Sequence, residues 1–289
     1  MTLESVPVPE PKKGEILVRN RYTTLCRSDL NTYSGKRTEK TPTILGHEIV
    51  GTIEAMGPGA PARDCRGSPL APGDLVTWAI YASDPHSPLS LRGIPQKAAD
   101  LFKYGHEKVT AENHLHGGLA AFCLLRPHTP TVRIQEDVPL PLIALINCSV
   151  ATVAGGLRLA GPLTGKTILV SGAGMLGLVA CAMSRTRGAG RILVVDVDEG
   201  RLDKSSRFGA DATLNLAECG KTAFRQLKEL AGCGKVDLAF DFSGEPSAME
   251  LALQVLGVGG SAIWIGATFP QRDISVNAER IVRGIHTIK

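Results

Sequence analysis

Hydrophobic and polar positions follow two different patterns along the chain. Up to about Cys148, short β-branched runs lie between turns rich in Pro and Gly, which predicts short strands in a compact β-rich domain. These runs are residues 15–20 (EILVRN), 49–56 (IVGTIEAM), 74–80 (DLVTWAI) and 129–134 (TPTVRI). From about Val150, apolar runs alternate with longer helical patterns, which predicts a parallel sheet with crossover helices. We therefore expect an α/β protein with two domains, residues 1–149 and 150–289.

A glycine-rich turn lies early in the second domain. The sequence SGAGMLG follows the apolar run 167–170 and precedes an apolar helical pattern, and its glycines have the spacing G-x-G-x-x-G. In that context the glycines permit a tight turn, let the backbone approach a pyrophosphate and let the helix pack closely on the strand. The motif predicts a Rossmann dinucleotide-binding domain with a doubly wound sheet. Its expected cofactor-binding residues are Gly172, Gly174, Met175, Leu176 and Gly177.

An acidic residue follows at the expected distance. Asp196 ends the run RILVVD, nineteen residues beyond Gly177, where a carboxylate is expected to bind the ribose hydroxyls. Such a carboxylate repels a 2′-phosphate, so NAD is favoured over NADP as the cofactor. Arg201 weakens that preference, because a nearby guanidinium accommodates a phosphate. The alternative is that Asp196 is only a solvated strand end.

Composition narrows the class of protein. The chain has 289 residues, 43% of them hydrophobic, with 32 Lys and Arg against 28 Asp and Glu. The basic residues are scattered, which argues against a nucleic-acid partner. The amino end lacks a signal-peptide pattern, and no run of about 18 apolar residues predicts a membrane span. We expect a soluble, cytoplasmic protein without a membrane partner.

Seven cysteines are spread through the chain, an odd number that favours free thiols or metal ligands over a disulfide framework. Cys26, His47 and Cys148 together form a set of two thiolates and an imidazole. Such a set leaves one tetrahedral position open, as a catalytic zinc requires. Each residue taken singly also fits a buried thiol or a satisfied core histidine.

At this point the chain resembles the zinc-containing alcohol dehydrogenases of the medium-chain dehydrogenase/reductase superfamily. The motifs PVPEPKKGEILVRN, CRSD, LGHEIVGTI, APGDLVTW, NCSVATV, GAGMLGL and VVDVD follow the family's order and spacing over nearly the whole chain. The resemblance implies a GroES-like catalytic domain before the Rossmann domain. Within the superfamily, TYSGKRTEKTPTILGHEIVG and LRGIPQKAADLFKYGHE look most like the phosphonate-catabolism-associated branch.

The resemblance also implies roles for individual residues. Cys26, His47 and Cys148 match the catalytic zinc ligands, with Glu48 as an outer or transient ligand. Ser28 matches the hydroxyl that binds the substrate alcohol. Two further residues match cofactor contacts: Arg27 at the pyrophosphate and Thr152 at the nicotinamide. For Asp29 we expect only a structural ion pair.

Three departures from the family pattern stand out. Asn31 occupies the position of the histidine that ends the proton relay in many relatives, and an asparagine does not titrate near neutral pH. The four positions that match the cysteines of a structural zinc carry no thiol, so that zinc is expected to be absent. They are Asp84, Ser87, Ser90 and Ala98. Both ends of the chain also look shorter than in relatives, and the sequence stops in an expected late strand of the Rossmann sheet, residues 286–289.

The leading hypothesis is a zinc-dependent, NAD-linked dehydrogenase that acts on a small-molecule alcohol, in a homodimer or homotetramer. Tyr33, Trp78 and Phe102 are the expected lining of its substrate pocket. One alternative is a zinc-free, NADP-linked quinone or enoyl reductase on the same fold. The other is a catalytically silent, truncated nucleotide-binding homologue.

Overall fold

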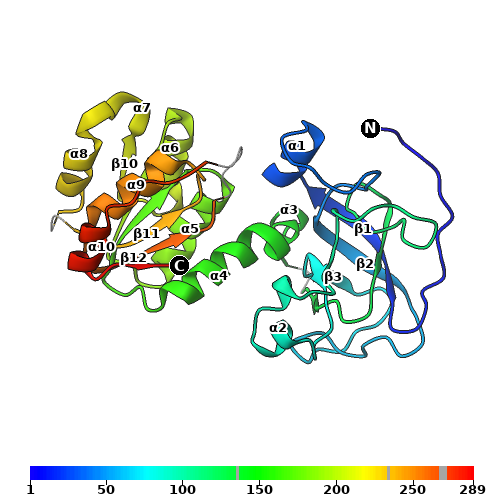
Figure 1. Cartoon of the computed structure of the whole chain (residues 1–289). Coiled ribbons are helices and arrows are strands. Elements are labelled where there is room, and N and C mark those ends of the chain that lie inside the picture. Colours follow the sequence, from blue (N-terminus) through cyan, green and yellow to red (C-terminus); the bar gives the residue numbers. More distant parts are fainter. Residues whose placement is uncertain (135–136, 233–234, 267–271) are drawn as a thin grey trace. The chain divides into compact units, whose positions relative to one another are not determined.

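The protein has two compact units, Met1–Cys148 and Ser149–Lys289. Their structure is a computed structural model that describes residues 1–134, 137–232, 235–266 and 272–289 (Figure 1). Each unit has its own sheet and its own hydrophobic core.

A five-stranded antiparallel sheet forms the centre of the first unit, with the strand order β6-β1-β2-β3-β7. Its strands are β1 (Ile16–Thr24), β2 (Glu48–Met56), β3 (Leu75–Trp78), β6 (Phe122–Leu125) and β7 (Thr131–Arg133). Four of the five overlap the β-branched runs, so the β-rich prediction is confirmed. The buried side chains of Ile16, Val18, Ile49 and Val76 build the core, because alternate residues of a strand face the same side of a sheet.

The first unit also contains short elements outside this sheet. They are the hairpin β4 (Tyr81–Ala82) and β5 (Phe102–Lys103), the helices α1 (Arg27–Tyr33), α2 (Pro88–Leu91) and α3 (Leu140–Ala144), and the 3-10 turn Pro95–Lys97.

The expected substrate-pocket lining is wrong for the buried Trp78, whereas for the partly exposed Phe102 and for Tyr33 it stays a prediction. Trp78 is 1% exposed and packs edge-on against Tyr104, and Phe102 meets the same tyrosine ring edge-on. Both rings complete the core of the first unit, because a buried aromatic ring contributes more there than at an open surface. Tyr33 is exposed at the end of α1.

The second unit has a six-stranded parallel sheet with the order β10-β9-β8-β11-β12-β13. The strands are β8 (Thr167–Ser171), β9 (Arg191–Asp196), β10 (Ala212–Asn215), β11 (Val236–Asp241), β12 (Leu256–Trp264) and β13 (Thr287–Ile288). The order corresponds to 3-2-1-4-5-6, which is the Rossmann arrangement. Both the doubly wound prediction and the late strand near residues 286–289 are confirmed.

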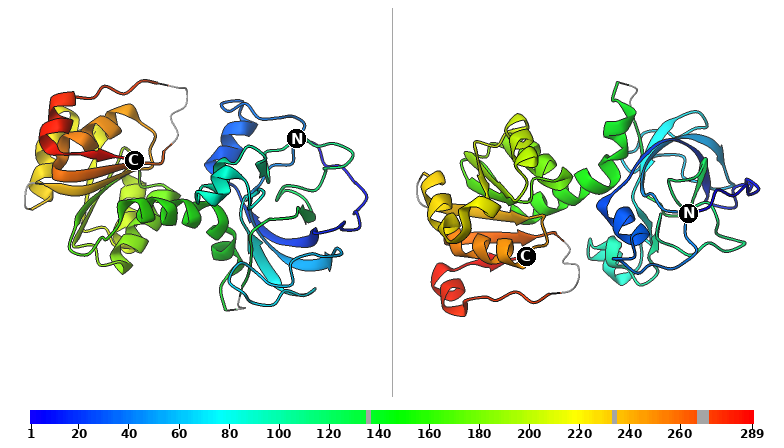
Figure 2. Two further views of the ribbon diagram at one scale, coloured as in Figure 1. Left: turned by 60° about the horizontal axis from the view of Figure 1, so that its bottom comes forward. Right: turned by 90° about the horizontal axis from the view of Figure 1, so that it is seen from above.

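Helices cover both faces of this sheet (Figure 2). Ile168 and Val170 of β8 pack with side chains of α4, α5 and α6, whereas Leu169 packs with side chains of α8 and α9. The helices are α4 (Ala151–Ala160), α5 (Met175–Thr186), α6 (Glu199–Ser205), α7 (Leu216–Cys219), α8 (Ala223–Leu230), α9 (Pro246–Val255) and α10 (Ala278–Gly284), with 3-10 turns at Ser206–Phe208 and Gly220–Thr222. Successive residues of β8 face opposite sides of the sheet. Because helices cover both sides, β8 is apolar on both of its faces.

One continuous helix, Leu140–Ala160, is long and apolar enough by length and composition to cross a membrane. Ile143 and Ala144 at its start pack against Val50 in one core, and Val153 and Leu157 near its end are buried in another. Core helices of soluble proteins can have the same length and composition, so this helix alone is weak evidence for a membrane span. The middle of the helix, Ile146–Val150, has π-helical geometry, which often marks a functional site.

Candidate metal and dinucleotide sites

Three side chains far apart in the sequence meet within the first unit. Cys26 is the N-cap of α1, His47 directly precedes β2, and Cys148 lies in the π-helical turn. Their ligand atoms all lie within 4.8 Å of one another, and Cys148 Sγ is 3.4 Å from His47 Nε2. His47 is buried, and both cysteines are partly buried. Among the described ranges, this is the one group of three or more potential ligands.

Glycines allow the chain to come together here. Gly46 has φ of +90°, and a Cβ on it would lie 3.1 Å from the Cα of Gly118. A Cβ on Gly105, whose φ is +78°, would lie 2.8 Å from the carbonyl oxygen of Gly46. At either position, a residue with a side chain would be strained by the positive φ and would crowd the neighbouring backbone. The segment around residue 105 therefore packs against Gly46 and His47, and the segment around residue 118 packs against Gly46.

The donor set fits a zinc ion. Zinc–sulfur bonds are about 2.3 Å and zinc–nitrogen bonds about 2.0–2.1 Å, so sulfur and nitrogen atoms of a tetrahedral site lie about 3.6 Å apart. The observed separation of 3.4 Å between Cys148 Sγ and His47 Nε2 is close to that value. Two thiolates and one imidazole are the ligands of a catalytic zinc that keeps one position open.

Asp29 connects two of the three ligand segments. Its Oδ1 accepts hydrogen bonds from His47 Nδ1 at 3.2 Å and from the Gly46 amide at 3.1 Å, and its Oδ2 accepts from the Cys26 amide at 2.9 Å. The carboxylate is 1% exposed. Because Nδ1 donates to Asp29, the Nε2 atom of His47 is left to bind a metal. The expected ion pair of Asp29 is thus with the imidazole itself.

Charges in the site are strongly coupled. A hydrogen bond from Cys148, acting against burial, lowers the pKa of Cys26 to about 3, and the same bond together with burial raises the pKa of Cys148. Burial alone would lower the pKa of His47, but its bonds to Asp29 and Cys26 raise that pKa to about 9. At neutral pH the Cys26 thiolate, at the start of a helix, therefore accepts hydrogen bonds from both the Cys148 thiol and the His47 imidazolium.

The predicted outer residues lie close to these ligands. Interaction with Ser28 helps to lower the pKa of Cys26, after the larger effects of Cys148 and His47. Glu48 is buried, accepts a hydrogen bond from Thr24 Oγ1 at 2.6 Å and bonds to the Cys148 thiol. Arg27 is exposed at the start of α1.

Sequence reasoning missed His106. Its ring lies 4.9 Å from the His47 ring, centroid to centroid, and the side chain is buried. Its Nδ1 is 3.2 Å from Glu39 Oε1 without hydrogen-bonding geometry. Burial and the charge of His47 lower the pKa of His106 to about 4, so its ring is neutral at pH 7. The only hint in the sequence was YGHE, a second glycine–histidine–glutamate like GHE at residues 46–48.

Asn147 was also missed, although it precedes a predicted ligand. Its Nδ2 donates to the carbonyl oxygen of His47 at 2.9 Å, and both residues are buried. This bond joins the Cys148 helix to the His47 segment, one hundred residues away in the sequence. We expect Asn147→Leu to weaken zinc binding about tenfold to a hundredfold, because outer partners hold ligands in place. Competition with a chromophoric chelator measures that affinity.

Asn20 offers a matched control. Its Nδ2 donates to a backbone carbonyl, that of Ala120, at 2.8 Å, and its Oδ1 is buried without a hydrogen-bond partner, as is that of Asn147. Asn20→Leu should therefore destabilise the fold to a similar degree and leave zinc affinity unchanged. Equal loss of zinc affinity in both variants would show that Asn147 matters only for folding.

The lobe that matches the structural-zinc segment is organised by hydrogen bonds. Ser87 caps α2, with its Oγ accepting from the Ser90 amide at 3.4 Å and donating to Ser90 Oγ at 2.8 Å. Ala98 is buried, and Asp84 accepts from the His86 amide at 2.8 Å. These contacts fix the turn locally. The loss of the structural zinc stays a prediction.

In the second unit, the glycine motif adopts the geometry of a dinucleotide turn. Gly172 directly follows β8 with φ of +96°, and Gly174 is the N-cap of α5. A Cβ on Gly177 would lie 1.9 Å from the carbonyl oxygen of Gly172, so only glycine lets the helix pack this closely on the strand. The turn lies beside β8, at the point where the strand order reverses between β8 and β11. Met175, half exposed, and the less exposed Leu176 form the first helical residues.

Asp196 lies at the carboxyl end of β9, next to that turn. Its Oδ2 accepts from the Ala173 amide at 2.7 Å, and its Oδ1 accepts from the amides of Val197 and Asp198 at 2.8 and 3.0 Å. Arg201 Nη1 is 3.9 Å from the same carboxylate. The carboxylate is therefore held rigidly and keeps acceptor capacity for a ligand. Thr152 is exposed on α4.

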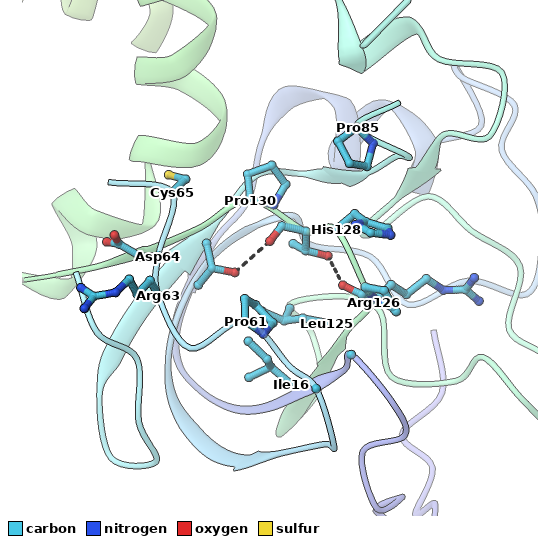
Figure 3. Close-up of a pocket in the computed structure, with 15 residues that line it drawn as sticks. Ile16, Pro61, Arg63, Asp64, Cys65, Pro85, Leu125, Arg126, His128 and Pro130 are labelled. Atoms are coloured by element: carbon cyan, nitrogen blue, oxygen red, sulfur yellow. Dashed lines mark hydrogen bonds between the residues drawn. The ribbon is translucent and has the colours of Figure 1, made fainter. Parts of the chain in front are cut away.

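A separate cavity of about 450 Å³ lies in the first unit and includes none of the predicted site residues (Figure 3). Four of its fifteen lining residues are prolines, among them Pro61 and Pro130, and the side chains of Arg63 and Arg126 extend away from each other. The Thr129 hydroxyl already donates to the Arg126 carbonyl at 2.7 Å.

Comparison with known families matches both units. Residues 12–136 match the model for the alcohol dehydrogenase GroES-like domain, and residues 176–289 match the model for zinc-binding dehydrogenases. These matches fall on the sheet of the first unit and on most of the Rossmann sheet.

Individual relatives agree with the models. The chain is 26% identical to a class-3 alcohol dehydrogenase of Oryza sativa subsp. japonica, over 98% of this chain and 77% of the relative. It is also 26% identical to an L-threonine 3-dehydrogenase of Pyrococcus furiosus, over 97% and 76%. The crystal structure of an alcohol dehydrogenase from Thermotoga maritima superposes with a TM-score of 0.90 at 26% identity, over 98% of this chain and 79% of that one. The chain therefore belongs to the zinc-containing medium-chain alcohol dehydrogenase family.

Proposed function

We propose that this protein is a zinc-dependent, NAD-linked alcohol dehydrogenase that oxidises a small-molecule alcohol to the aldehyde or ketone. The observation that carries the proposal is the convergence of two cysteine sulfurs and one imidazole nitrogen within 4.8 Å. The rigid Asp196 carboxylate beside the glycine turn supports a dinucleotide with free ribose hydroxyls.

Zinc, when bound, supplies Lewis-acid activation of the alcohol hydroxyl, and the nicotinamide, when bound, accepts the hydride. The chain holds the metal through Cys26, His47 and Cys148 and orients the imidazole through Asp29. Ser28 binds the alcohol hydroxyl and carries its proton outward. Asn31 cannot accept that proton, so solvent or the ribose hydroxyls take it.

The zinc-free reductase is the weaker alternative. It would have no use for an imidazole that a buried carboxylate orients toward two sulfurs. The silent homologue would bind the dinucleotide but turn over no alcohol.

A panel of alcohols assayed with NAD at the nicotinamide absorbance separates these functions. Alcohol-dependent formation of NADH by zinc-loaded protein supports the proposal. Oxidation of NADPH by an enone in metal-free protein would favour the reductase, and dinucleotide binding without turnover on any alcohol would favour the silent homologue.

Cofactor choice gives a second test. We expect Asp196→Asn to raise the ratio of NADPH to NADH affinity about tenfold or more, because it removes a charge that repels the 2′-phosphate. Asp203→Asn removes an exposed charge from α6 and should leave the ratio unchanged. Fluorescence titration with each cofactor gives the ratio. An unchanged ratio in Asp196→Asn would contradict the role given to Asp196.

A further inference from the structure

The second unit contains a buried carboxylate that is not among the predicted site residues. Asp241 ends β11 and is 1% exposed. Its strand neighbours in the sheet are Ser171 of β8 and Trp264 of β12, so it lies at the carboxyl edge of three adjacent strands. Ligands of open α/β sheets bind beyond this edge, where the strand order reverses.

The Asp241 carboxylate accepts hydrogen bonds from the loop that follows it. Oδ1 accepts from the Ser243 hydroxyl at 2.6 Å and from the Ser243 amide at 3.3 Å, and Oδ2 accepts from the Gly244 amide at 3.0 Å. Its main-chain oxygen also accepts from the amides of Ile265 and Gly266, both at 3.0 Å. Burial raises the pKa of Asp241, and the bonds from Ser243 and Gly244 act in the opposite direction by favouring the ionised form.

The loop that Asp241 holds packs directly on the glycine turn. The Phe242 amide donates to the Ser171 carbonyl at 2.9 Å. A Cβ on Gly172 would lie 3.1 Å from the Ser243 nitrogen, and a Cβ on Gly266 would lie 2.3 Å from the Gly244 nitrogen. Residues 242–244 are therefore held between the glycine turn on one side and Gly266 on the other. A shift of this loop would move the wall against which Gly172 turns.

We propose that Asp241 is a positioning residue for the dinucleotide, which it serves by fixing residues 242–244 against the Gly172 turn. The inference rests on the proposed function only in taking NADH as the ligand. It adds a residue whose carboxylate bonds to the loop and would act through it.

An aspartate is needed because both of its oxygens accept hydrogen bonds. Asparagine has the same shape, but its Nδ2 would face the Gly244 amide or the Ser243 donors, and one set of buried donors would lose its acceptor. Asp241→Asn is therefore expected to displace the loop while leaving the strand in place.

The test compares two aspartates of the same strand. Asp237 lies near the other end of β11, and its Oδ2 accepts from the Thr167 amide at 2.8 Å. Asp237→Asn removes the same charge from the same strand, but its remaining amide oxygen can still accept from the Thr167 amide, far from the glycine turn. We expect Asp241→Asn to weaken NADH binding about tenfold in a fluorescence titration and Asp237→Asn to leave it unchanged.

Binding of 5′-AMP shows whether the effect is local. AMP lacks the second phosphate and the nicotinamide riboside, so calorimetry should give the same AMP affinity for wild type and Asp241→Asn. If Asp241→Asn folds poorly, Ser243→Ala removes only the hydroxyl donor and should weaken NADH binding about threefold with AMP binding intact.

Two results would overturn the inference alone: NADH affinity equal to wild type in Asp241→Asn and Ser243→Ala, or equal losses for NADH and AMP. A wild-type protein that binds no NADH would overturn the proposed function, and this inference with it.

Discussion

Cys148→Ala is expected to abolish alcohol oxidation, with a loss of about a thousandfold or more in kcat/KM. Zinc contributes several kcal/mol to charge stabilisation in such reactions, and each 1.36 kcal/mol is tenfold in rate. The two ligands that remain, Cys26 and His47, cannot hold a tetrahedral ion. The assay is formation of NADH with the best alcohol of the panel.

Cys65→Ala is the control for the loss of a thiol. Cys65 is an exposed free cysteine of the same unit and lies outside the metal cluster. Its variant should retain zinc and activity. If Cys148→Ala oxidises alcohols as fast as wild type, the zinc mechanism is wrong.

Zinc affinity is expected to rise steeply with pH. In the metal-free site, His47 has a pKa of about 9 and the pKa of Cys148 is raised, so both are protonated near pH 7, whereas Cys26, with a pKa of about 3, is a thiolate. Zinc has to displace the protons of His47 and Cys148. We expect release of about two protons per zinc and an affinity that rises about a hundredfold per pH unit.

Calorimetry in buffers of different ionisation enthalpy measures this proton release. Asp29→Asn removes the main group that raises the pKa of His47, so that variant should release about one proton near pH 8. Zinc affinity that is independent of pH, with no proton release, would contradict the assigned charge states.

The same pKa values fix the sign of the effect on stability without metal. The folded-state pKa of His47, about 9, lies above its ordinary value of 6.5. Protonated His47 therefore stabilises the metal-free fold fully below pH 6.5, and this contribution is lost as the pH rises through 9.

Much of the fold followed from the sequence because its patterns are local. Strand β8 and the turn at Gly172 are encoded within a few residues, and alternation of apolar runs with helical patterns predicts a parallel sheet. The convergence of Cys26, His47 and Cys148 could also be predicted, because each residue lies in a short motif of the family.

The supporting residues were missed because their partners are distant in the sequence. Asn147 bonds to a main-chain carbonyl that any residue would present at position 47. His106 reaches His47 only because Gly105 and Gly46 lack side chains that would separate the two segments. Trp78 was placed in a pocket because an aromatic residue suits either a pocket or a core, and only packing against Tyr104 decides between them.

The central claim is that Cys26, His47 and Cys148 bind one zinc ion together. X-ray absorption at the zinc edge of the purified protein tests this most directly. We predict about one zinc per chain with two sulfur neighbours at about 2.3 Å and nitrogen or oxygen neighbours at about 2.0–2.1 Å. A protein without zinc after metal loading, or a zinc shell without sulfur, would contradict it.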